Sequence, residues 1–397
     1  MAGSQPVSEE VVVTGIATGG DGIARLADGR VVFCEGALPG ERVGIAVREM
    51  RRDFARASVV DVVVASEARR SPPCPQLARG CGGCTWQHVR PEHQPFLKAD
   101  IVRDALRRIA HRPDVPVTVG GAVGEVGYRT SVRLSVDRAG RPTYRRRRSH
   151  TELAVDSCLV SHPLLAELIV EGRFPGASEV GLRVGARTGE RMAWTNGEAT
   201  PTLPLGTRYG HDAAIDELVG GRRWRISAGA FFQSGPGAAE MLVSSVLRAI
   251  GAERGTVVDL YAGGGLLGGS IAAAGGADRL VTVESNRAAV QDARTNLAEF
   301  GAEVIHADVA SYAGNPADVV VADPARSGLG PAAARSAAAL GATTLVLVSC
   351  DSASLARDAV LLTALGYALQ AVEVLDLFPD TFHLETVSRF GKVEDRR

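Results

Sequence analysis

The chain has 397 residues, and a prior of ~150 residues per domain predicts two or three compact units. This length excludes a disulfide-stapled miniprotein. Hydrophobic residues make up 45% of the chain and charged residues 22%, as in ordinary globular proteins. No apolar run approaches the ~18 residues of a membrane helix, so a membrane-spanning helix is excluded. The net charge of −1 hides an asymmetry, because residues 1–160 carry 24 Lys and Arg against 18 Asp and Glu, and the remainder carries 20 against 27.

The N-terminal part of the sequence predicts the cellular location of the protein and a small β-barrel. Residues 1–10 have neither the basic leader nor the apolar core of a secretory signal, so we expect a cytoplasmic protein. From residue 9 to residue 64, five short β-rich runs alternate with glycine turns. This pattern is typical of a small closed barrel, because closure leaves no strand edge unpaired. We assign residues 7–66 to the barrel and expect Cys34 in its core.

Four cysteines form the next recognisable pattern. Cys74, Cys81 and Cys84 stand as Cys-x6-Cys-Gly-Gly-Cys, and Cys158 lies 74 residues farther on. Four thiolates can hold zinc or an iron–sulfur cluster, and disulfides are disfavoured in a cytoplasmic protein. Three clustered cysteines plus a remote one favour an iron–sulfur cluster over the paired spacing of zinc fingers. A zinc site, and a Cys158 that is simply buried, stay open as alternatives.

The middle of the chain predicts one long helix and a β domain. Apolar residues at helical spacing predict a helix over residues 91–111. Residues 121–210 alternate strands with glycine-rich connections. We assign residues 67–212 to a central domain that contains the cysteine site, and we expect the helix to be available for packing on the domain that follows.

Beyond Arg222 the pattern changes to alternating strands and helices. Such alternation is typical of a doubly wound sheet with helices on both faces. We assign residues 213–397 to this Rossmann-like domain. The predicted strands are 257–260, 280–284, 304–305, 318–322, 344–349, 368–375 and 386–390.

A glycine-rich loop after the first of these strands predicts a nucleoside-binding site. The loop contains Gly263, Gly265 and Gly268, and Glu284 ends the next strand. Glycines let a ligand approach the backbone, and the acid can accept hydrogen bonds from both ribose hydroxyls. The Gly-x-Gly-x-x-Gly pattern also fits a dinucleotide. The C-terminal segments 323–328, 348–351 and 380–386 suit methyl transfer and offer no hydride acceptor, which favours S-adenosylmethionine.

Three further segments end predicted strands, namely Asp323–Gly328, Val348–Asp351 and Asp380–Thr386. Open α/β sheets place their sites at these strand ends, so we expect the segments to converge in one cleft. Together with Phe231–Gln233 and the cysteine pattern, they resemble the RNA uracil-5-methyltransferases, the family of the 23S rRNA and tRNA ribothymidine-forming enzymes.

The resemblance also covers the N-terminus. Residues 22–25, 36–43 and 54–57 resemble the TRAM domain, an oligonucleotide-binding barrel of RNA-modifying enzymes. The implied fold is an α/β multidomain chain with an N-terminal OB-like TRAM barrel, a central β domain with an iron–sulfur site, and a C-terminal class I (Rossmann-like) methyltransferase domain. The implied cofactors are S-adenosyl-L-methionine and a [4Fe-4S] cluster.

The resemblance also implies residue roles. Cys350 would be the nucleophile and Glu385 the base. C5 of uracil attacks a sulfonium methyl group only after a thiolate has added to C6, and a base must then remove the C5 proton. The helix start expected at Asp351 would lower the pKa of the Cys350 thiol. The methyl-donor and uracil site would be lined by Gln233, Tyr261, Gly263, Gly265, Glu284, Asp308 and Asp323.

Two departures from the family pattern bear on the alternatives. Leu266 stands where relatives usually have a polar residue, which questions cofactor affinity and would suit a non-catalytic RNA-binding or ribosome-assembly factor. Ala325 replaces the second proline of Asp-Pro-Pro-Arg, which affects loop geometry. RNA cytosine-5 methylation is a third hypothesis, but relatives of that type carry a second cysteine where Ala325 stands.

RNA is the expected partner of a monomeric protein, and no membrane partner is expected. The barrel and the cysteine pattern together resemble the rRNA-directed members, which favours rRNA, while tRNA stays possible. Tyr144–Arg148, and Arg51 with Arg52 beside Phe54, predict contacts to phosphates and unpaired bases. An arginine run taken alone is more often a solvated hairpin.

Overall fold

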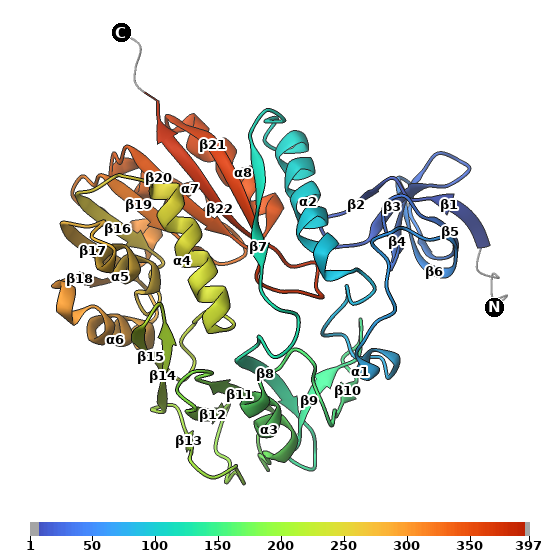
Figure 1. Cartoon of the computed structure of the whole chain (residues 1–397), viewed down its shortest axis with the longest axis horizontal. Coiled ribbons are helices and arrows are strands. Elements are labelled where there is room, and N and C mark those ends of the chain that lie inside the picture. The colour runs from blue at the N-terminus through green and yellow to red at the C-terminus, as the bar shows by residue number, and fades with distance from the viewer. Residues whose placement is uncertain (1–7, 394–397) are drawn as a thin grey trace.

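The computed structural model describes residues 8–393. Residue 7, where the barrel is predicted to begin, and residues 394–397 of the last predicted domain lie outside this range. A barrel, a central β region and a large α/β region surround the long helix α2 (Gln94–Arg108), as Figure 1 shows. No helix within the described range is long and apolar enough to cross a membrane.

Six strands form the N-terminal barrel, in the order β1-β5-β6-β4-β3-β2. One more strand is present than the sequence predicts, because Gly15–Ile16 pairs with its neighbour as the short β2. Alternate residues face one apolar core, in which Cys34 is fully buried as expected. The strands are β1 (Ser8–Val12), β2 (Gly15–Ile16), β3 (Gly22–Arg25), β4 (Val31–Glu35), β5 (Arg42–Met50) and β6 (Phe54–Val64).

The central region is a second six-stranded sheet, in the order β10-β9-β8-β11-β12-β13. Helix α3 (Pro163–Glu171) covers it with Leu165 and Leu168, both fully buried. The short helix α1 (Pro75–Ala78) lies within the cysteine pattern. The strands are β8 (Ser131–Val136), β9 (Pro142–Arg145), β10 (Glu152–Leu153), β11 (Glu179–Val184), β12 (Arg191–Thr195) and β13 (Thr207–Tyr209).

The C-terminal sheet has eight strands, in the order β18-β17-β16-β19-β20-β22-β21-β7. All seven strands predicted beyond Arg222 are present. Strands β16 to β20 run parallel and β22 is antiparallel to β20. The strands are β7 (Val117–Ala122), β16 (Thr256–Leu260), β17 (Arg279–Glu284), β18 (Glu303–His306), β19 (Val319–Ala322), β20 (Thr344–Ser349), β21 (Tyr367–Asp376) and β22 (Glu385–Lys392).

Helices cover both faces of this sheet. Buried residues of α4, α5 and α6 belong to one apolar core, and those of α2, α7 and α8 belong to the other. Strands β19 and β20 are buried along their whole length, because both of their faces are covered. A hairpin of β14 (Ala214–Val219) and β15 (Arg222–Ser227) contacts α4 and α6. The helices are α4 (Pro236–Ile250), α5 (Leu266–Ala273), α6 (Arg287–Asn296), α7 (Gly330–Ala339) and α8 (Ser352–Ala364).

The segment from α2 to β7 differs from the predicted domain organisation. The boundary at 67–212 keeps both elements in the central region, whereas α2 packs on α8 and β21, and β7 pairs in parallel with β21 as the outer strand of the C-terminal sheet. A parallel pairing across some 250 residues leaves no short-range signal in the sequence, which is why it escaped prediction. Helix α2 therefore packs on the C-terminal region.

The barrel is docked on both other regions. Gly20 lies so close to Trp86 and Phe382 that a Cβ atom there would come within 2.5 Å of the Trp86 Nε1 atom. The Trp86 indole donates a hydrogen bond to the Gly20 carbonyl (3.1 Å). Glu35 of β4 is buried and forms ion pairs with Arg147 (2.5 Å) and Arg148 (2.8 Å) of the central region. These contacts place the barrel beside the loop between β21 and β22.

Candidate functional site

Two of the predicted site residues meet at the ends of neighbouring strands. Strands β20 and β22 are antiparallel, and their register pairs Ser349 with Thr386, whose hydroxyl donates to the Ser349 carbonyl (2.9 Å). One residue farther toward this edge, Cys350 follows β20 and Glu385 is the first residue of β22. These two residues therefore stand opposite each other. Asp323 follows β19, the strand on the other side of β20. The expected convergence of three strand ends is present.

Carboxyl groups at this edge of the sheet are buried. Glu385 is almost fully buried, and its Oε1 atom has no hydrogen-bond partner among the described residues. Burial raises the pKa of Glu385 well above its ordinary value, and the neighbouring Asp323 carboxylate raises it further, whereas Arg326 opposes the shift. Burial raises the pKa of Asp323 as well. An unpartnered buried carboxyl with a raised pKa is typical of a group used in proton transfer.

The Cys350 thiol does not have the lowered pKa that its position before a helix predicts. Helix α8 does begin at Ser352, but Asp351 is its N-cap and accepts a hydrogen bond from the Ser354 amide (2.8 Å). Burial, followed by the carboxyls of Glu385 and Asp323, raises the pKa of Cys350 to about 11, and Arg326 only partly opposes this. The capped helix end is therefore outweighed by burial and two acidic neighbours.

A polar pair borders the cluster. The Arg326 guanidinium lies 2.7 Å from His383 Nδ1, and the imidazole also contacts the Phe382 ring at 4.4 Å between centroids. Burial, and then the Arg326 charge, lower the pKa of His383 to about 4. Arg326 is the cation that opposes the raised pKa values of the Cys350 thiol and of Glu385.

A small cavity of about 50 Å³ opens beside this cluster, at the end of β16. It is lined by four of the predicted donor-site residues, Gln233, Tyr261, Gly263 and Asp323, together with Leu266. Phe231 also lines it and is 68% exposed, so its ring is available to a ligand. Arg183 of β11 donates to the Ala230 carbonyl (3.2 Å), which supports the loop that carries Phe231 and Gln233.

The backbone around the cavity is strained in the way that a ligand-binding loop requires. Tyr261 has φ +60° although it is not a glycine, and Gly263 and Gly265 also lie in the left-handed region. A Cβ atom on Gly263 would have only the Phe231 carbonyl within 4 Å, so the glycine leaves open space there, whereas a Cβ on Gly265 would meet Leu297 at 2.7 Å. This cradle fits the close approach of a nucleoside.

Glu284 and Asp308 lie at the rim. The Glu284 carboxylate accepts hydrogen bonds from the amides of Gly263 (2.9 Å) and Asn286 (2.6 Å), which fixes its position at the end of β17. Asp308 is exposed and caps a short turn by accepting from the Ala310 amide (2.8 Å). Its charge contributes, after burial, to the raised pKa of Tyr261.

Asp259 is a residue of this region that the sequence analysis did not select. It is fully buried in β16, one oxygen accepts from the Gly268 amide (2.8 Å), and the other has no partner among residues 8–393. Burial raises its pKa to about 7. A charged residue inside an apolar strand just before a glycine loop was the available signal. Leu266 is buried in the adjacent apolar core.

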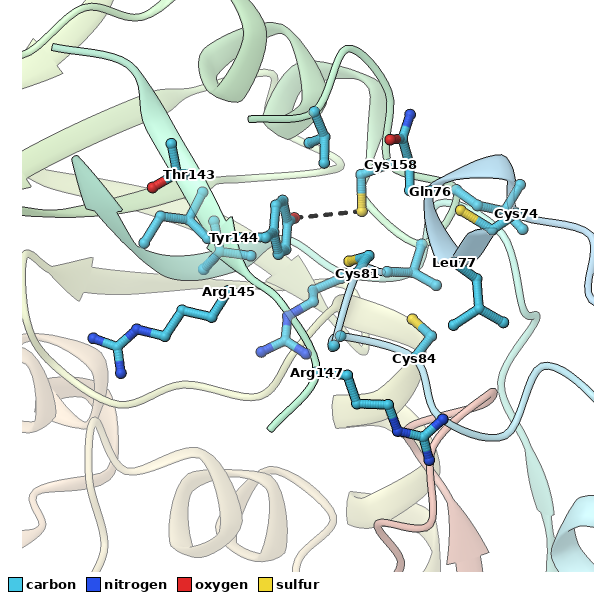
Figure 2. Close-up of a pocket in the computed structure, with 18 of the residues that line it drawn as sticks. Cys74, Gln76, Leu77, Cys81, Cys84, Thr143, Tyr144, Arg145, Arg147 and Cys158 are labelled. Carbon is cyan, nitrogen blue, oxygen red and sulfur yellow. Dashed lines mark hydrogen bonds between the residues drawn. The ribbon is translucent and has the colours of Figure 1, made fainter. Parts of the chain in front are cut away.

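The four cysteines of the N-terminal pattern surround one cavity of about 550 Å³, hereafter the Cys cavity. Cys74, Cys81 and Cys84 reach it from the loop around α1, and Cys158 reaches it from the central region. Figure 2 shows their four sulfur atoms turned toward the same space, with the Tyr144 hydroxyl 3.4 Å from the Cys158 sulfur. The remote cysteine and the clustered three therefore line the same cavity.

The chemistry of the donor set bears on the groups that it could hold. Among the described residues, no group of three or more His, Cys, Asp or Glu side chains is arranged to hold a metal ion. Four thiols are the ligand set of tetrahedral zinc sites and of iron–sulfur clusters alike.

The arginine run lies against the same loop. Backbone hydrogen bonds join Gly82 to the Arg145 carbonyl (3.1 Å) and Arg147 to the Gly80 carbonyl (3.0 Å). Arg147 and Arg148 form the ion pairs with barrel residue Glu35 described above. The expected phosphate-binding run is therefore partly a structural hairpin, and Arg145, which is exposed, forms no ion pair within the described part of the chain.

Comparison with known proteins places this geometry in a family. Residues 8–60 match the TRAM domain and residues 226–351 match the methyltransferase small domain. A protein of Streptomyces avermitilis named an uncharacterized RNA methyltransferase is 33% identical, over 96% of this chain and 97% of the relative. The 23S rRNA (uracil(1939)-C(5))-methyltransferase RlmD of Chromohalobacter salexigens is 31% identical, over 94% of this chain and 87% of that protein.

This chain belongs to the RNA uracil-5-methyltransferase family. Its fold agrees, because the tRNA (uracil-54, C5)-methyltransferase of Pyrococcus abyssi, solved in complex with S-adenosyl-L-homocysteine, superimposes with a TM-score of 0.73 at 22% identity. That likeness covers 96% of this chain and 99% of the other. As an RNA uracil-5-methyltransferase family member, the protein is an RNA methyltransferase with an N-terminal TRAM domain.

Proposed function

We propose that this protein methylates C5 of a specific uridine in RNA, with S-adenosylmethionine as methyl donor and Cys350 as covalent nucleophile. The observation that carries the proposal is the strand register that sets Cys350 against Glu385, with Asp323 at the end of the next strand. Addition at C6 and removal of the C5 proton need a thiol and a carboxyl at one edge of the base, and this register supplies both.

Cys350 acts first. Its thiol gives up its proton to solvent, and the thiolate sulfur forms a bond to C6 of uracil, which makes C5 enolate-like. C5 would then bond to the methyl carbon of the donor while the sulfonium–methyl bond breaks, with S-adenosylhomocysteine as the leaving group. Because burial and two carboxyls raise the pKa of Cys350 to about 11 in the free protein, the thiolate is scarce at neutral pH. Arg326 is the neighbouring cation that opposes this shift.

Glu385 acts second. Its carboxylate takes the C5 proton, the C6–S bond breaks, and the thiolate of Cys350 is released. Glu385 then loses the proton to solvent and the Cys350 thiolate regains one, so one proton in net is released for each methyl group transferred. Burial gives this carboxylate the basicity that the step requires, since its pKa lies well above the ordinary value.

The glycine cradle supports the donor assignment. S-adenosylmethionine supplies an electrophilic methyl group when it is bound. Gly263 leaves open space at the end of β16, Glu284 is fixed beside it for a ribose, and Asp323 and Gln233 line the cavity. Asp323 is also a neighbour of Cys350. Leu266 adds an apolar wall to this cavity and does not fill the cradle at Gly263. This favours a working enzyme over a non-catalytic RNA-binding factor.

We assign a [4Fe-4S] cluster to the Cys cavity, with Cys74, Cys81, Cys84 and Cys158 as its ligands. The support is that all four thiols reach one roomy cavity. The reaction above needs no electron transfer, so the cluster's role is structural: it ties the loop around α1 to the central region. The other predicted residues, Tyr261, Gly265 and Asp308, are assigned to the methyl-donor site.

Ribosomal RNA is the proposed substrate, and tRNA is the alternative. The RlmD relative is named for 23S rRNA, which favours rRNA, while the structural neighbour is named for tRNA. Mass-spectrometric mapping of 5-methyluridine in both RNAs, from cells with and without the gene, tests the function and the substrate together. Loss of one 23S rRNA site supports the proposal, loss of a tRNA site alone selects the alternative, and unchanged 5-methyluridine in both contradicts it.

A further inference from the structure

The loop that leads into Glu385 is held by residues from a distant part of the sequence, between residues 70 and 128. Residues 377–384 connect β21 to β22 without regular secondary structure, so contacts from elsewhere must fix their conformation. In the middle, Asp380 has φ +63°, a left-handed conformation that a residue other than glycine rarely adopts. Strain of this kind persists only where the surroundings enforce it.

Helix α2 supplies the first constraint through a buried ion pair. Lys98 is fully buried, and its ammonium donates to Asp376 Oδ1 (2.6 Å) and to the Phe378 carbonyl (3.1 Å). The same nitrogen lies 5.9 Å from the Trp86 ring centroid. A charge pair placed in an apolar core costs desolvation and is weak evidence for stability, so its presence here suggests a geometric role.

The second constraint is a reciprocal pair one helical turn earlier. The Gln94 side chain donates to Asp380 Oδ1 (3.0 Å) and accepts from the Asp380 backbone amide (2.7 Å). Arg70 donates to the same carboxylate oxygen (2.7 Å). Gln94 thus binds both the side chain and the backbone of Asp380, the loop residue with a left-handed conformation.

Two neighbours complete the support. The Trp86 backbone amide donates to the Asp380 carbonyl (2.8 Å), and the Tyr128 hydroxyl donates to the Pro379 carbonyl (3.2 Å). Residues from 70 to 128 therefore bind the loop at Asp376, Phe378, Pro379 and Asp380.

We propose that Gln94 and Lys98 are positioning residues that hold Glu385 in place for removal of the C5 proton. The inference rests on the proposed function, because it takes Glu385 as the base. The side-chain hydrogen bonds of Gln94 and Lys98 end on Val89 and on residues 376–380, whereas Cys350 is placed by β20. Loss of these contacts should therefore slow elimination more than addition and methyl transfer.

The test compares how the covalent intermediate partitions. Gln94→Met keeps an unbranched side chain and removes both hydrogen bonds to Asp380. With labelled methyl donor and substrate RNA, the quantity measured is the ratio of methylated protein–RNA adduct, stable to denaturing electrophoresis, to released methylated RNA. We expect this ratio to rise by about 10-fold or more, because a misplacement of about 1 Å can cost up to about 100-fold in rate.

A second pair of changes avoids leaving a buried charge without a partner. Lys98→Met combined with Asp376→Asn removes both members of the ion pair, and the same rise in the ratio is expected. Arg107→Gln, on the exposed side of α2, is the matched control and should behave as wild type. Thermal melting identifies the variants that fold. If Gln94→Met does not fold, Gln94→Asn, which keeps the amide but shortens its reach, decides the question.

The outcomes separate the two claims. If Glu385→Gln traps the adduct while the Gln94 and Lys98 variants lose adduct and product in equal proportion, with an unchanged ratio, these residues serve stability only and the inference is overturned. If Glu385→Gln itself traps no adduct, the proposed function fails instead. Trapping by Glu385→Gln and by folded Gln94 and Lys98 variants, with a normal Arg107→Gln, supports both.

Discussion

Cys350 and Cys84 of the Cys cavity are both buried thiols with raised pKa values, and their neighbours differ. Burial raises the pKa of Cys350 to about 11 and that of Cys84 to about 12. Beside Cys350 stand the carboxyls of Asp323 and Glu385, with Arg326 as the opposing cation. The Cys cavity is lined instead by four thiols and the arginine hairpin.

This difference separates two chemistries of one residue type. A lone thiol next to carboxyls remains protonated in the free protein and becomes a nucleophile when its proton is lost next to a substrate. Thiols grouped around a cavity can be held as thiolates by a positively charged metal group, because ligand deprotonation is coupled to metal binding. The neighbours, more than the burial, decide which chemistry each thiol serves.

Replacing Cys350 should have the largest effect. Cys350→Ala removes the atom that bonds to C6, so we expect methylation to fall by roughly 10⁴-fold or more. Transfer of a labelled methyl group to substrate RNA is the measurement. Cys34→Ala, which removes a buried thiol from the barrel core, is the matched control and should retain activity. Methylation by Cys350→Ala at a rate near that of wild type would mean that the two thiol sites are not distinguished by function.

Replacing a thiol of the Cys cavity should abolish a spectrum. Protein purified without oxygen should be brown, with a broad visible absorption that Cys81→Ser loses and Cys34→Ala keeps. Visible spectroscopy with iron and zinc analysis makes the measurement. A colourless wild-type protein with stoichiometric zinc would contradict the cluster assignment.

The carboxyls beside Cys350 predict the direction of pKa changes at the thiol. Asp323→Asn removes a negative charge that raises the pKa of Cys350, so it should lower that pKa by about one unit, whereas Arg326→Gln should raise it. The rate of alkylation by iodoacetamide as a function of pH reports the thiolate.

Because Cys350 and Glu385 both have raised pKa values and must be deprotonated, kcat/KM should rise with pH through neutrality. Shifts of the Cys350 pKa opposite in sign in Asp323→Asn and Arg326→Gln, or a kcat/KM that falls with pH, would contradict the claim that neighbouring charges distinguish Cys350 from the thiols of the Cys cavity.

The arginine hairpin should show the smallest effects, and they should differ by residue. Arg145→Ala should weaken RNA binding a few-fold, more at low salt, and reduce the slope of log affinity against log salt by about 1, as for one lost phosphate contact. Arg148→Ala should mainly loosen the barrel, because Arg148 pairs with Glu35 and Asp21. Binding assays at two salt concentrations and thermal melting measure both. Equal salt slopes for both variants would refute this division of roles.

The residues that sequence could predict are those whose pattern is local. Three features each lie at the end of an apolar run: the glycines after β16, Glu284 at the end of β17, and the motif around Cys350. Predicting the strands from the sequence therefore also predicted that these residues lie at strand ends. The pairing of β7 with β21 and the binding of Asp380 by Gln94 join positions more than 250 residues apart and leave no local signal.

The charged neighbours of a side chain were the other feature that the sequence could not predict. The sequence shows a helix start after Cys350, which alone predicts a lowered pKa, and only the folded arrangement shows that Asp323 and Glu385 face the thiol. In the same way, Arg147 and Arg148 resemble RNA contacts in the sequence, and the fold sets them against Glu35 of the barrel. Which charges meet depends on packing between distant segments.

The most direct test of the proposed mechanism is covalent trapping by Glu385→Gln. With labelled methyl donor and a uridine-containing substrate RNA, this variant should accumulate a protein–RNA adduct methylated at C5, because addition and methyl transfer proceed while removal of the C5 proton is blocked. The double variant with Cys350→Ala should form none. Full turnover by Glu385→Gln would show that another group is the base, and an adduct that persists without Cys350 would contradict the assignment of the nucleophile.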